Sequence, residues 1–175
     1  MKTKYSYVLL MIVFVGMFTS CNKKHTLPYG VFTFQQQLTL SGTPNSIYDT
    51  VTGDISGWWD HSFSEKPYKL YIEPKPGGGF YEIYNEAGDG VKHATVIVAD
   101  RGKMLRFEGP LGLSGKAILL VCTYSFKAVG TDSTTLTLDV HASGEIEQGI
   151  DKIVAQVWHH FLVERLKPYV EAVKN

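Results

Sequence analysis

Few cysteines, no net charge and a single long apolar run limit what this chain can be. Its 175 residues include two cysteines, and Lys and Arg balance Asp and Glu to a formal net charge of zero. Without a basic excess there is no electrostatic case for nucleic-acid binding. The apolar run at residues 8–18 covers 11 positions, too few to span a bilayer comfortably. With 44% hydrophobic and 19% charged residues, the composition is that of one globular domain with a single core.

Aromatic side chains are plentiful, at 13% of the sequence with 10 Tyr and 9 Phe. Rigid apolar rings can line a cavity, and they can equally fill an ordinary core. Within residues 53–63, GDISGWWDHSF, two adjacent tryptophans stand among turn-forming residues. Neighbours in a strand or helix cannot both face the core squarely. We therefore expect one of Trp58 and Trp59 to pack under the sheet and the other to cap a pocket entrance; the alternative is ordinary core and rim packing for both.

The N-terminus has the features of a targeting segment. Lys2 and Lys4 precede the apolar run, and FTSC ends in Cys21. This resembles the lipobox of bacterial lipoproteins, although Phe18 stands where Leu or Val is usual. The resemblance implies a signal peptide at 1–20, a lipidated Cys21 and a linker at 21–30. It also implies a membrane-anchored protein of the bacterial cell envelope, and the lack of an acidic run in NKKH after Cys21 favours the periplasmic side. An uncleaved anchor and a soluble secreted protein are the alternatives.

Acylation of Cys21 would leave Cys122 without a disulfide partner, so the fold would rest on its core alone. Cys122 lies in an apolar strand pattern and is expected to be a small buried hydrophobe.

The remaining chain, residues 31–175, reads as one domain. Residues 31–42 alternate as a first strand. A short helix is expected next, with Thr43 as its N-cap and Pro44 at the first helical position. Five or six further short strands follow, separated by Gly- and Asp-rich turns, which is typical of an antiparallel meander.

The segment from Gly149 to Val173 carries an unbroken helical apolar stripe. Such a helix would be about 37 Å long, enough to cross a sheet, and Pro168 should kink its last turn. The expected fold class is α+β: a curved antiparallel sheet of six to seven strands wrapped around a long C-terminal helix, with two short helices after the first strand.

Four segments in this order resemble the START-like (SRPBCC) superfamily, in particular its branch of activator-of-heat-shock-ATPase-like and polyketide cyclase-like domains. They are TPNSIYDTVTGDISGWW, IEPKPGGGFYEIY, ADRGKMLRFEGPLG and VWHHFLVERLKPYV, and the resemblance covers residues 31–173. It implies a helix-grip fold with a ligand cavity whose opening is bordered by the aromatic turn. The leader sequence separates the chain from any cytoplasmic heat-shock ATPase, so protein partners stay unknown.

Several kinds of chemistry lack a sequence signal. No G-x-S-x-G nucleophile elbow occurs, and no helix follows the triple glycine at 77–79 to bind phosphate. His159 and His160 diverge on a helix, and His61, His93 and His141 are far apart, so we expect no metal site and no cofactor. Acid–base candidates are Asp60, His61, Arg106, Glu108, Tyr124 and His141. Arg106 and Glu108 share one strand face, where a salt bridge is the simplest interpretation.

The leading hypothesis is a non-catalytic protein that holds a small hydrophobic or amphipathic ligand between the sheet and the terminal helix. Arg106 or Tyr124 would supply polarity. The expected lining comprises Trp58, Trp59, Phe63, Phe80, Tyr84, Arg106, Phe107, Tyr124, Trp158 and Phe161. A cyclase- or hydrolase-type enzyme with Asp60, His61 or Tyr124 as acid or base is one alternative. An interaction domain whose own side chains fill the cavity is another.

Overall fold

A computed structural model describes residues 28–173. The expected signal peptide, Cys21 and most of the linker at 21–30 lie outside the described residues. Among the residues that are described, no helix is both long and apolar enough to cross a membrane.

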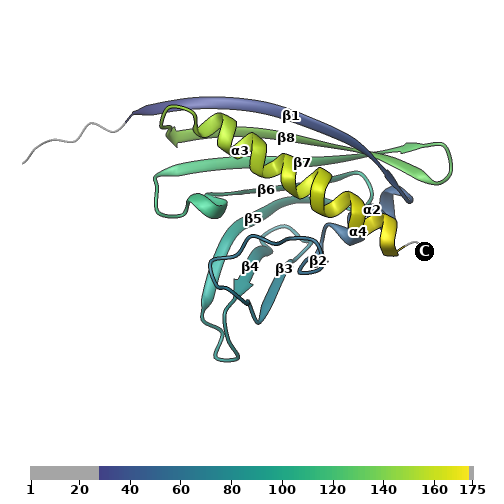
Figure 1. The fold of residues 1–175 in the computed structure, drawn as a ribbon, viewed down its shortest axis with the longest axis horizontal. Coiled ribbons are helices and arrows are strands. Elements are labelled where there is room, and N and C mark those ends of the chain that lie inside the picture. The colour runs from purple at the N-terminus through teal and green to yellow at the C-terminus, as the bar shows by residue number, and fades with distance from the viewer. Residues whose placement is uncertain (1–27, 174–175) are drawn as a thin grey trace, which may run out of the picture.

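Eight strands of residues 28–173 form one curved antiparallel sheet (Figure 1). Their order across the sheet is β1-β8-β7-β6-β5-β4-β3-β2, so paired strands are consecutive in sequence except where β1 pairs with β8, and β1 and β2 form the two edges. The expected α+β class is confirmed, with one strand more than the upper expectation, because Gly53 and Asp54 pair with β3. The strands are β1 (Tyr29–Ser41), β2 (Gly53–Asp54), β3 (Lys69–Ile72), β4 (Gly79–Ile83), β5 (Gly90–Asp100), β6 (Met104–Gly109), β7 (Ile118–Val129) and β8 (Ser133–Glu145).

One short α-helix, α2 (Pro44–Thr50), follows β1. Its cap is the expected one, because the Thr43 side chain accepts a hydrogen bond from the Ser46 N–H and Pro44 occupies the first turn. The expected second short helix is not found in the described residues. Residues 55–59 form a turn instead, in which the N–H groups of Trp58 and Trp59 both donate to the Ile55 carbonyl. Asp54 accepts from Ser56 N–H and so favours a turn at this point.

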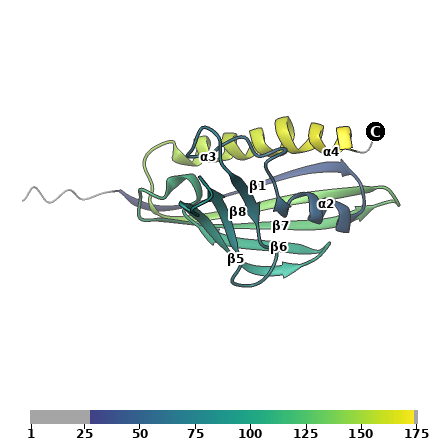
Figure 2. The same cartoon turned by 90° about the horizontal axis from the view of Figure 1, so that it is seen from below.

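The C-terminal stripe forms one long helical element in three parts: α3 (Ile150–His159), the π-helical η2 (His160–Leu166) and α4 (Lys167–Val173). It lies across one face of the sheet (Figures 1 and 2). The π-helical segment ends at Leu166, two residues before Pro168, and the kink expected at Pro168 stays a prediction. The wider turns of a π-helix accommodate a proline, which lacks an N–H and crowds the preceding carbonyl.

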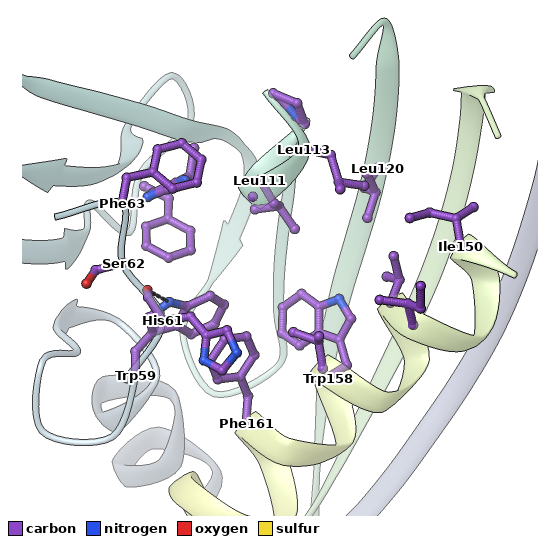
Figure 3. Close-up of a pocket in the computed structure, with 17 residues that line it drawn as sticks. Trp59, His61, Ser62, Phe63, Leu111, Leu113, Leu120, Ile150, Trp158 and Phe161 are labelled. Carbon is purple, nitrogen blue, oxygen red and sulfur yellow. Dashed lines mark hydrogen bonds between the residues drawn. The ribbon is translucent and has the colours of Figure 1, made fainter. Parts of the chain in front are cut away.

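The hydrophobic core lies between the sheet and this helix. Cys122 is fully buried within it, as expected. A short 3-10 helix, η1 (Leu111–Leu113), connects β6 to β7. Together with the long β2–β3 connection, it closes the space under the N-terminal half of the terminal helix (Figure 3).

Candidate functional site

A cavity of about 290 Å³ lies between the terminal helix, the β2–β3 connection, η1 and the sheet (Figure 3). Its walls are almost entirely apolar and aromatic. They are formed by Trp59, His61, Ser62, Phe63, Phe80, His93, Pro110, Leu111, Gly112, Leu113, Leu120, Ile150, Ile153, Val154, Val157, Trp158 and Phe161.

The two adjacent tryptophans divide between core and cavity. Trp58 is 1% exposed, and its indole N–H donates to the Thr50 carbonyl at 3.0 Å. Trp59 lines the cavity, where it stacks on Phe161 with ring centroids 3.7 Å apart. Phe80 and Trp158 meet Trp59 edge-on at 5.0 and 5.7 Å. One tryptophan therefore belongs to the core and the other to a wall of packed rings.

Half of the residues expected to line the cavity do so, namely Trp59, Phe63, Phe80, Trp158 and Phe161. Trp58, Tyr84, Arg106, Phe107 and Tyr124 lie elsewhere. Phe107 and Tyr124 are buried behind Trp158, with ring centroids 6.4 and 6.0 Å from its own. Tyr84 lies in the turn after β4, where its N–H donates to the Asp89 carbonyl.

Arg106 lies on the other face of β6 from the buried Leu105 and Phe107. Its Nε donates to Thr123 Oγ1 at 2.8 Å. Within residues 28–173, no ion pair joins it to Glu108, so the expected salt bridge is replaced by this hydrogen bond.

A buried carboxylate lies behind the cavity wall. Glu82 of β4 is fully buried and accepts hydrogen bonds from the backbone N–H groups of Phe63 and Ser64 at 2.9 and 2.8 Å. The Ser64 hydroxyl and His93 Nε2 are further partners at 3.1 and 3.0 Å. Burial, the largest single influence, raises the pKa of Glu82, but the hydrogen bonds together hold that pKa below its ordinary value. Glu82 is therefore an ionised carboxylate.

A β-bulge directs His93 toward the cavity. Phe80 pairs with Ala94 and Tyr81 with Lys92, so His93 is the extra residue of β5. His93 and Ala94 are consequently both buried, although successive residues of a regular strand alternate between faces. The backbone of β6 approaches closely here, since a Cβ on Gly109 would lie only 2.4 Å from the His93 carbonyl oxygen.

His93 is one of the few polar residues that line the cavity. Because the Glu82 carboxylate is an acceptor, Nε2 of His93 is the nitrogen that donates to it, and a neutral ring would then carry its acceptor lone pair on Nδ1. Within the described residues Nδ1 has no hydrogen-bond partner. The ring packs between Phe63 and Phe80, with centroids 5.2 and 5.0 Å away. His93 is thus a rigidly held polar group in an apolar wall.

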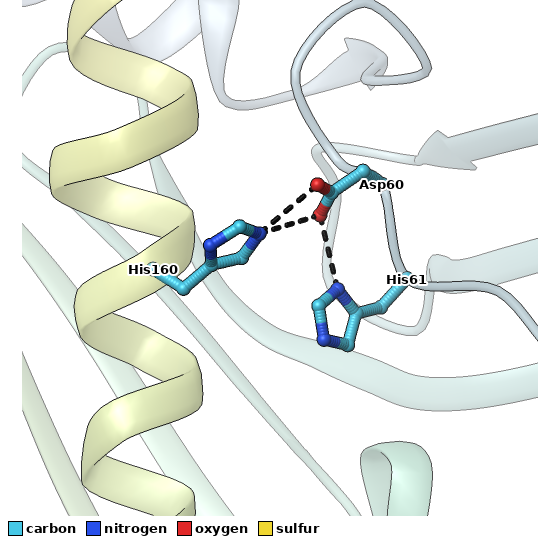
Figure 4. Close-up of side chains that lie close together, drawn as sticks. All are labelled: Asp60, His61 and His160. Atoms are coloured by element: carbon cyan, nitrogen blue, oxygen red, sulfur yellow. Dashed lines mark hydrogen bonds and ion pairs between the residues drawn. The ribbon is translucent and has the colours of Figure 1, made fainter.

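A second polar cluster lies at the cavity rim, where the β2–β3 connection meets the terminal helix (Figure 4). His61 Nδ1 lies 3.0 Å from Asp60 Oδ1, and His160 Nε2 lies 3.0 Å from both oxygens of Asp60. Glu164 binds the other nitrogen of His160 at 2.8 Å, and Arg165 Nε lies 3.2 Å from Asp60 Oδ2.

In this rim cluster, Asp60 and His160 each stabilise the charged form of the other. Burial raises the pKa of Asp60, but the hydrogen bonds with His61 and His160 and the charge of Arg165 bring it below its ordinary value. The hydrogen bond to Glu164, followed by that to Asp60, raises the pKa of His160.

Of the acid–base candidates, only His61 lines the cavity. Tyr124 is fully buried, its hydroxyl has no hydrogen-bond partner among residues 28–173, and burial raises its pKa well above the ordinary range. Burial likewise raises the pKa of the Cys122 thiol far above its usual value. His141 is exposed on β8 and points away from this region's buried face.

Sequence reasoning missed Glu82 as a functional candidate and considered His93 only as a metal ligand. A signal existed for Glu82, which shares a strand face with Phe80 and so places a charge where alternation predicts core. No comparable signal existed for His93, because a bulge breaks the alternation on which such reasoning depends.

In comparisons with known proteins, no family model and no curated protein matches the chain. Solved structures match in fold. A protein of unknown function from Staphylococcus aureus has a TM-score of 0.63 at 10% identity, covering 83% of this chain and 97% of its own. An uncharacterized protein from Rhizobium leguminosarum has a TM-score of 0.57 at 12% identity, with 85% and 99% covered.

Norcoclaurine synthase from Thalictrum flavum, solved in complex with a transition-state analogue, has a TM-score of 0.50 at 13% identity, with 86% and 100% covered. At such identities the similarity concerns the fold alone. The chain therefore has the helix-grip fold that its sequence predicts, in which a long C-terminal helix lies against a curved antiparallel sheet.

Proposed function

We propose that this chain is a START-like protein of the bacterial cell envelope that binds a small hydrophobic or amphipathic ligand in the cavity between its sheet and terminal helix. The observation that carries the proposal is the cavity wall, in which Trp59, Phe80, Trp158 and Phe161 pack edge and face around an apolar space. Burying apolar ligand surface there is worth about 25 cal/mol per Å².

The size and lining of the cavity define the ligand class. A volume of about 290 Å³ lies at the lower end of small-molecule pockets, which run from roughly 300 to 1,000 Å³. A compact, largely apolar guest suits it. A neutral His93 ring would favour a guest with one O–H or N–H group, because a buried acceptor left unpaired in an apolar wall is penalised.

The membrane is the second proposed partner, reached through a lipidated Cys21. The sequence pattern of residues 1–21 supports this anchor. The described domain starts close behind it, with β1 at Tyr29, so a short linker would hold the cavity near the membrane surface. Several acyl chains would make the attachment stable, since each buried CH₂ contributes about 0.8 kcal/mol.

Native mass spectrometry of the protein, purified gently from its own host's envelope, tests both partners. A co-purifying small mass that disappears on unfolding supports the carrier, and a mass increment of acyl chains at Cys21 supports the anchor. Bare protein in repeated preparations contradicts the carrier and favours the interaction domain whose interior is filled by its own side chains.

Matched tryptophan variants locate the ligand. We expect Trp59→Ala to weaken binding of the co-purified ligand at least tenfold, because it removes the ring stacked on Phe161. Trp58→Phe is the control, since this neighbour lies in the core and off the cavity. Equal effects of both variants on affinity would place the ligand elsewhere.

One observation favours a second candidate function, a cyclase- or hydrolase-type enzyme. A carboxylate-held imidazole facing an apolar cavity is suited to accept a proton from a bound substrate. In such an enzyme His93 would be the base and Glu82 would fix its tautomer. Conversion of the co-purified ligand to a species of different mass, lost in His93→Gln with the melting temperature retained, would favour it over the carrier.

A further inference from the structure

Within the rim cluster, two adjacent side chains of one loop, Asp60 and His61, meet a third, His160, from a distant helix. Asp60 and His61 come from the β2–β3 connection, and His160 begins the π-helical segment η2, 100 positions from Asp60. One oxygen of Asp60 and one nitrogen of each histidine all lie within 4.8 Å of one another. Figure 4 shows both imidazoles facing the same carboxylate.

From this convergence we propose that Asp60, His61 and His160 form a binding site for a divalent transition-metal ion of the zinc class. Two imidazoles and one carboxylate are ligands that such ions accept. Neighbouring ligand atoms around a tetrahedral Zn²⁺ lie about 3.3 Å apart, given bonds of ~2.0–2.1 Å. The contacts of 3.0 Å from Asp60 to each histidine nitrogen are close to that spacing.

His160 is oriented as a metal ligand is. Its Nδ1 lies 2.8 Å from Glu164 Oε2 on the next helical turn. A carboxylate that accepts from one imidazole nitrogen leaves the lone pair of the other available, which is the usual arrangement around metal-bound histidines. That second nitrogen, Nε2, points at both oxygens of Asp60. This geometry places a positive charge between Nε2 and Asp60, either a proton carried by Nε2 or a metal ion in its place.

Two further features fit an ion at this place. The His61 side chain is 55% exposed, so its ring can turn toward the ion without displacing core residues. Arg165 competes for one oxygen of Asp60, but its side chain is 43% exposed and has solvent to turn into. The fourth position would face water at the rim of the cavity, which His61 also lines.

The ion would join the β2–β3 connection to the terminal helix. Trp59 and Phe161, which stack across the same junction, flank the cluster in sequence. The metal site stands independently of the proposed ligand, since none of its contacts requires an occupied cavity.

Titration of ZnCl₂ alone into the full chain, stripped with chelator and held in detergent, tests the proposal by calorimetry. We expect one Zn²⁺ per chain. Asp60→Asn, His61→Ala and His160→Ala should each weaken binding at least tenfold, and Glu164→Gln about tenfold as an outer-shell change. Arg165→Gln should strengthen binding, because it removes a competing positive charge beside Asp60. His159→Ala is the matched control, an exposed histidine on the same helix outside the cluster.

Substitution of Co²⁺ gives a second readout, since its visible absorption reports the coordination number and geometry of the bound ion. A spectrum lost in His160→Ala and kept in His159→Ala supports the site. Binding that is absent, or that is equally strong in all the ligand variants, would overturn it and leave a proton as the charge between Asp60 and His160. Circular dichroism of each variant excludes unfolding as the cause of lost binding.

Discussion

Two carboxylates hold the segment from Trp59 to Ser64, and they lie in opposite surroundings. Glu82 fixes the segment to the sheet from a fully buried position and receives four hydrogen bonds. Asp60 fixes it to the terminal helix from the exposed rim, and the side chains of its partners are 29–55% exposed. Breaking the Glu82 contacts is costly, because it leaves a buried charge without partners. Breaking the Asp60 contacts costs little, because water can hydrate the exposed charges instead. The segment that forms this cavity wall is therefore held firmly to the sheet and only weakly to the terminal helix.

Loss of the buried carboxylate should have the largest effect. Glu82→Ala leaves His93 and two backbone N–H groups without their acceptor, and we expect the free energy of unfolding to fall by roughly 3–5 kcal/mol. Urea denaturation at neutral pH measures this. Glu86→Ala, in the exposed turn after β4, is the control and should change stability by less than about 0.5 kcal/mol. Similar losses in both variants would mean that Glu82 is not a buried anchor.

Acid should weaken the same connection in part. The folded-state pKa of Glu82 is below its ordinary value of 4.5, so its stabilising contribution is complete above that pH. The contribution is lost as the pH falls through the lowered pKa. We expect the melting temperature of the parent to fall more steeply over this acid range than that of Glu82→Gln. Parallel curves would show that another carboxylate governs acid unfolding.

The Tyr124 hydroxyl is the opposite case to Glu82, because among residues 28–173 it is buried without a hydrogen-bond partner. Tyr124 is as deeply buried as Glu82, but its OH meets no donor or acceptor. Tyr124→Phe should therefore raise the free energy of unfolding by about 1 kcal/mol. Tyr124→Leu, which removes ring packing as well, should lower it. Destabilisation by the Phe variant would reveal a partner for the hydroxyl.

Change at the exposed carboxylate should have the smallest effect on folding. With chelator present, Asp60→Asn should alter the free energy of unfolding by no more than about 1 kcal/mol, the usual range for exposed ion pairs. The same urea experiment compares it directly with Glu82→Ala. A loss that approached the Glu82 value would show that the helix side is as firmly held as the sheet side.

Local chemistry made much of the fold predictable. The start of α2 is predictable from residues 43–46, because Thr43 caps the helix and Pro44 begins it. The alternation of apolar and polar residues identifies the long strands. The prediction of a second short helix was wrong. A single turn positions the two tryptophans instead, because the backbone N–H groups of Trp58 and Trp59 both donate to the Ile55 carbonyl.

The sequence pattern predicts which face of a strand or helix a residue occupies, but not which residues of that face reach the cavity. Phe107 was expected to line the cavity, but it is buried against Trp158 and lies outside the lining. Arg106, its neighbour in the strand, necessarily faces the other way. The bulge at His93 and the meeting of His61 with His160 depend on strand register and on contacts between distant segments. Neither is encoded in local periodicity.

The pairing of β1 with β8 has a consequence for how the chain folds. Each other pair of neighbouring strands is consecutive in sequence, whereas this one joins Tyr29 to Glu145 and Ser41 to Ser133. Contacts this distant in sequence close slowly, because the loop entropy must be overcome first. During synthesis, β1 emerges first and must await the last strand. In a chain anchored at Cys21 as proposed, the end nearest the membrane would thus be the last to be built into the sheet.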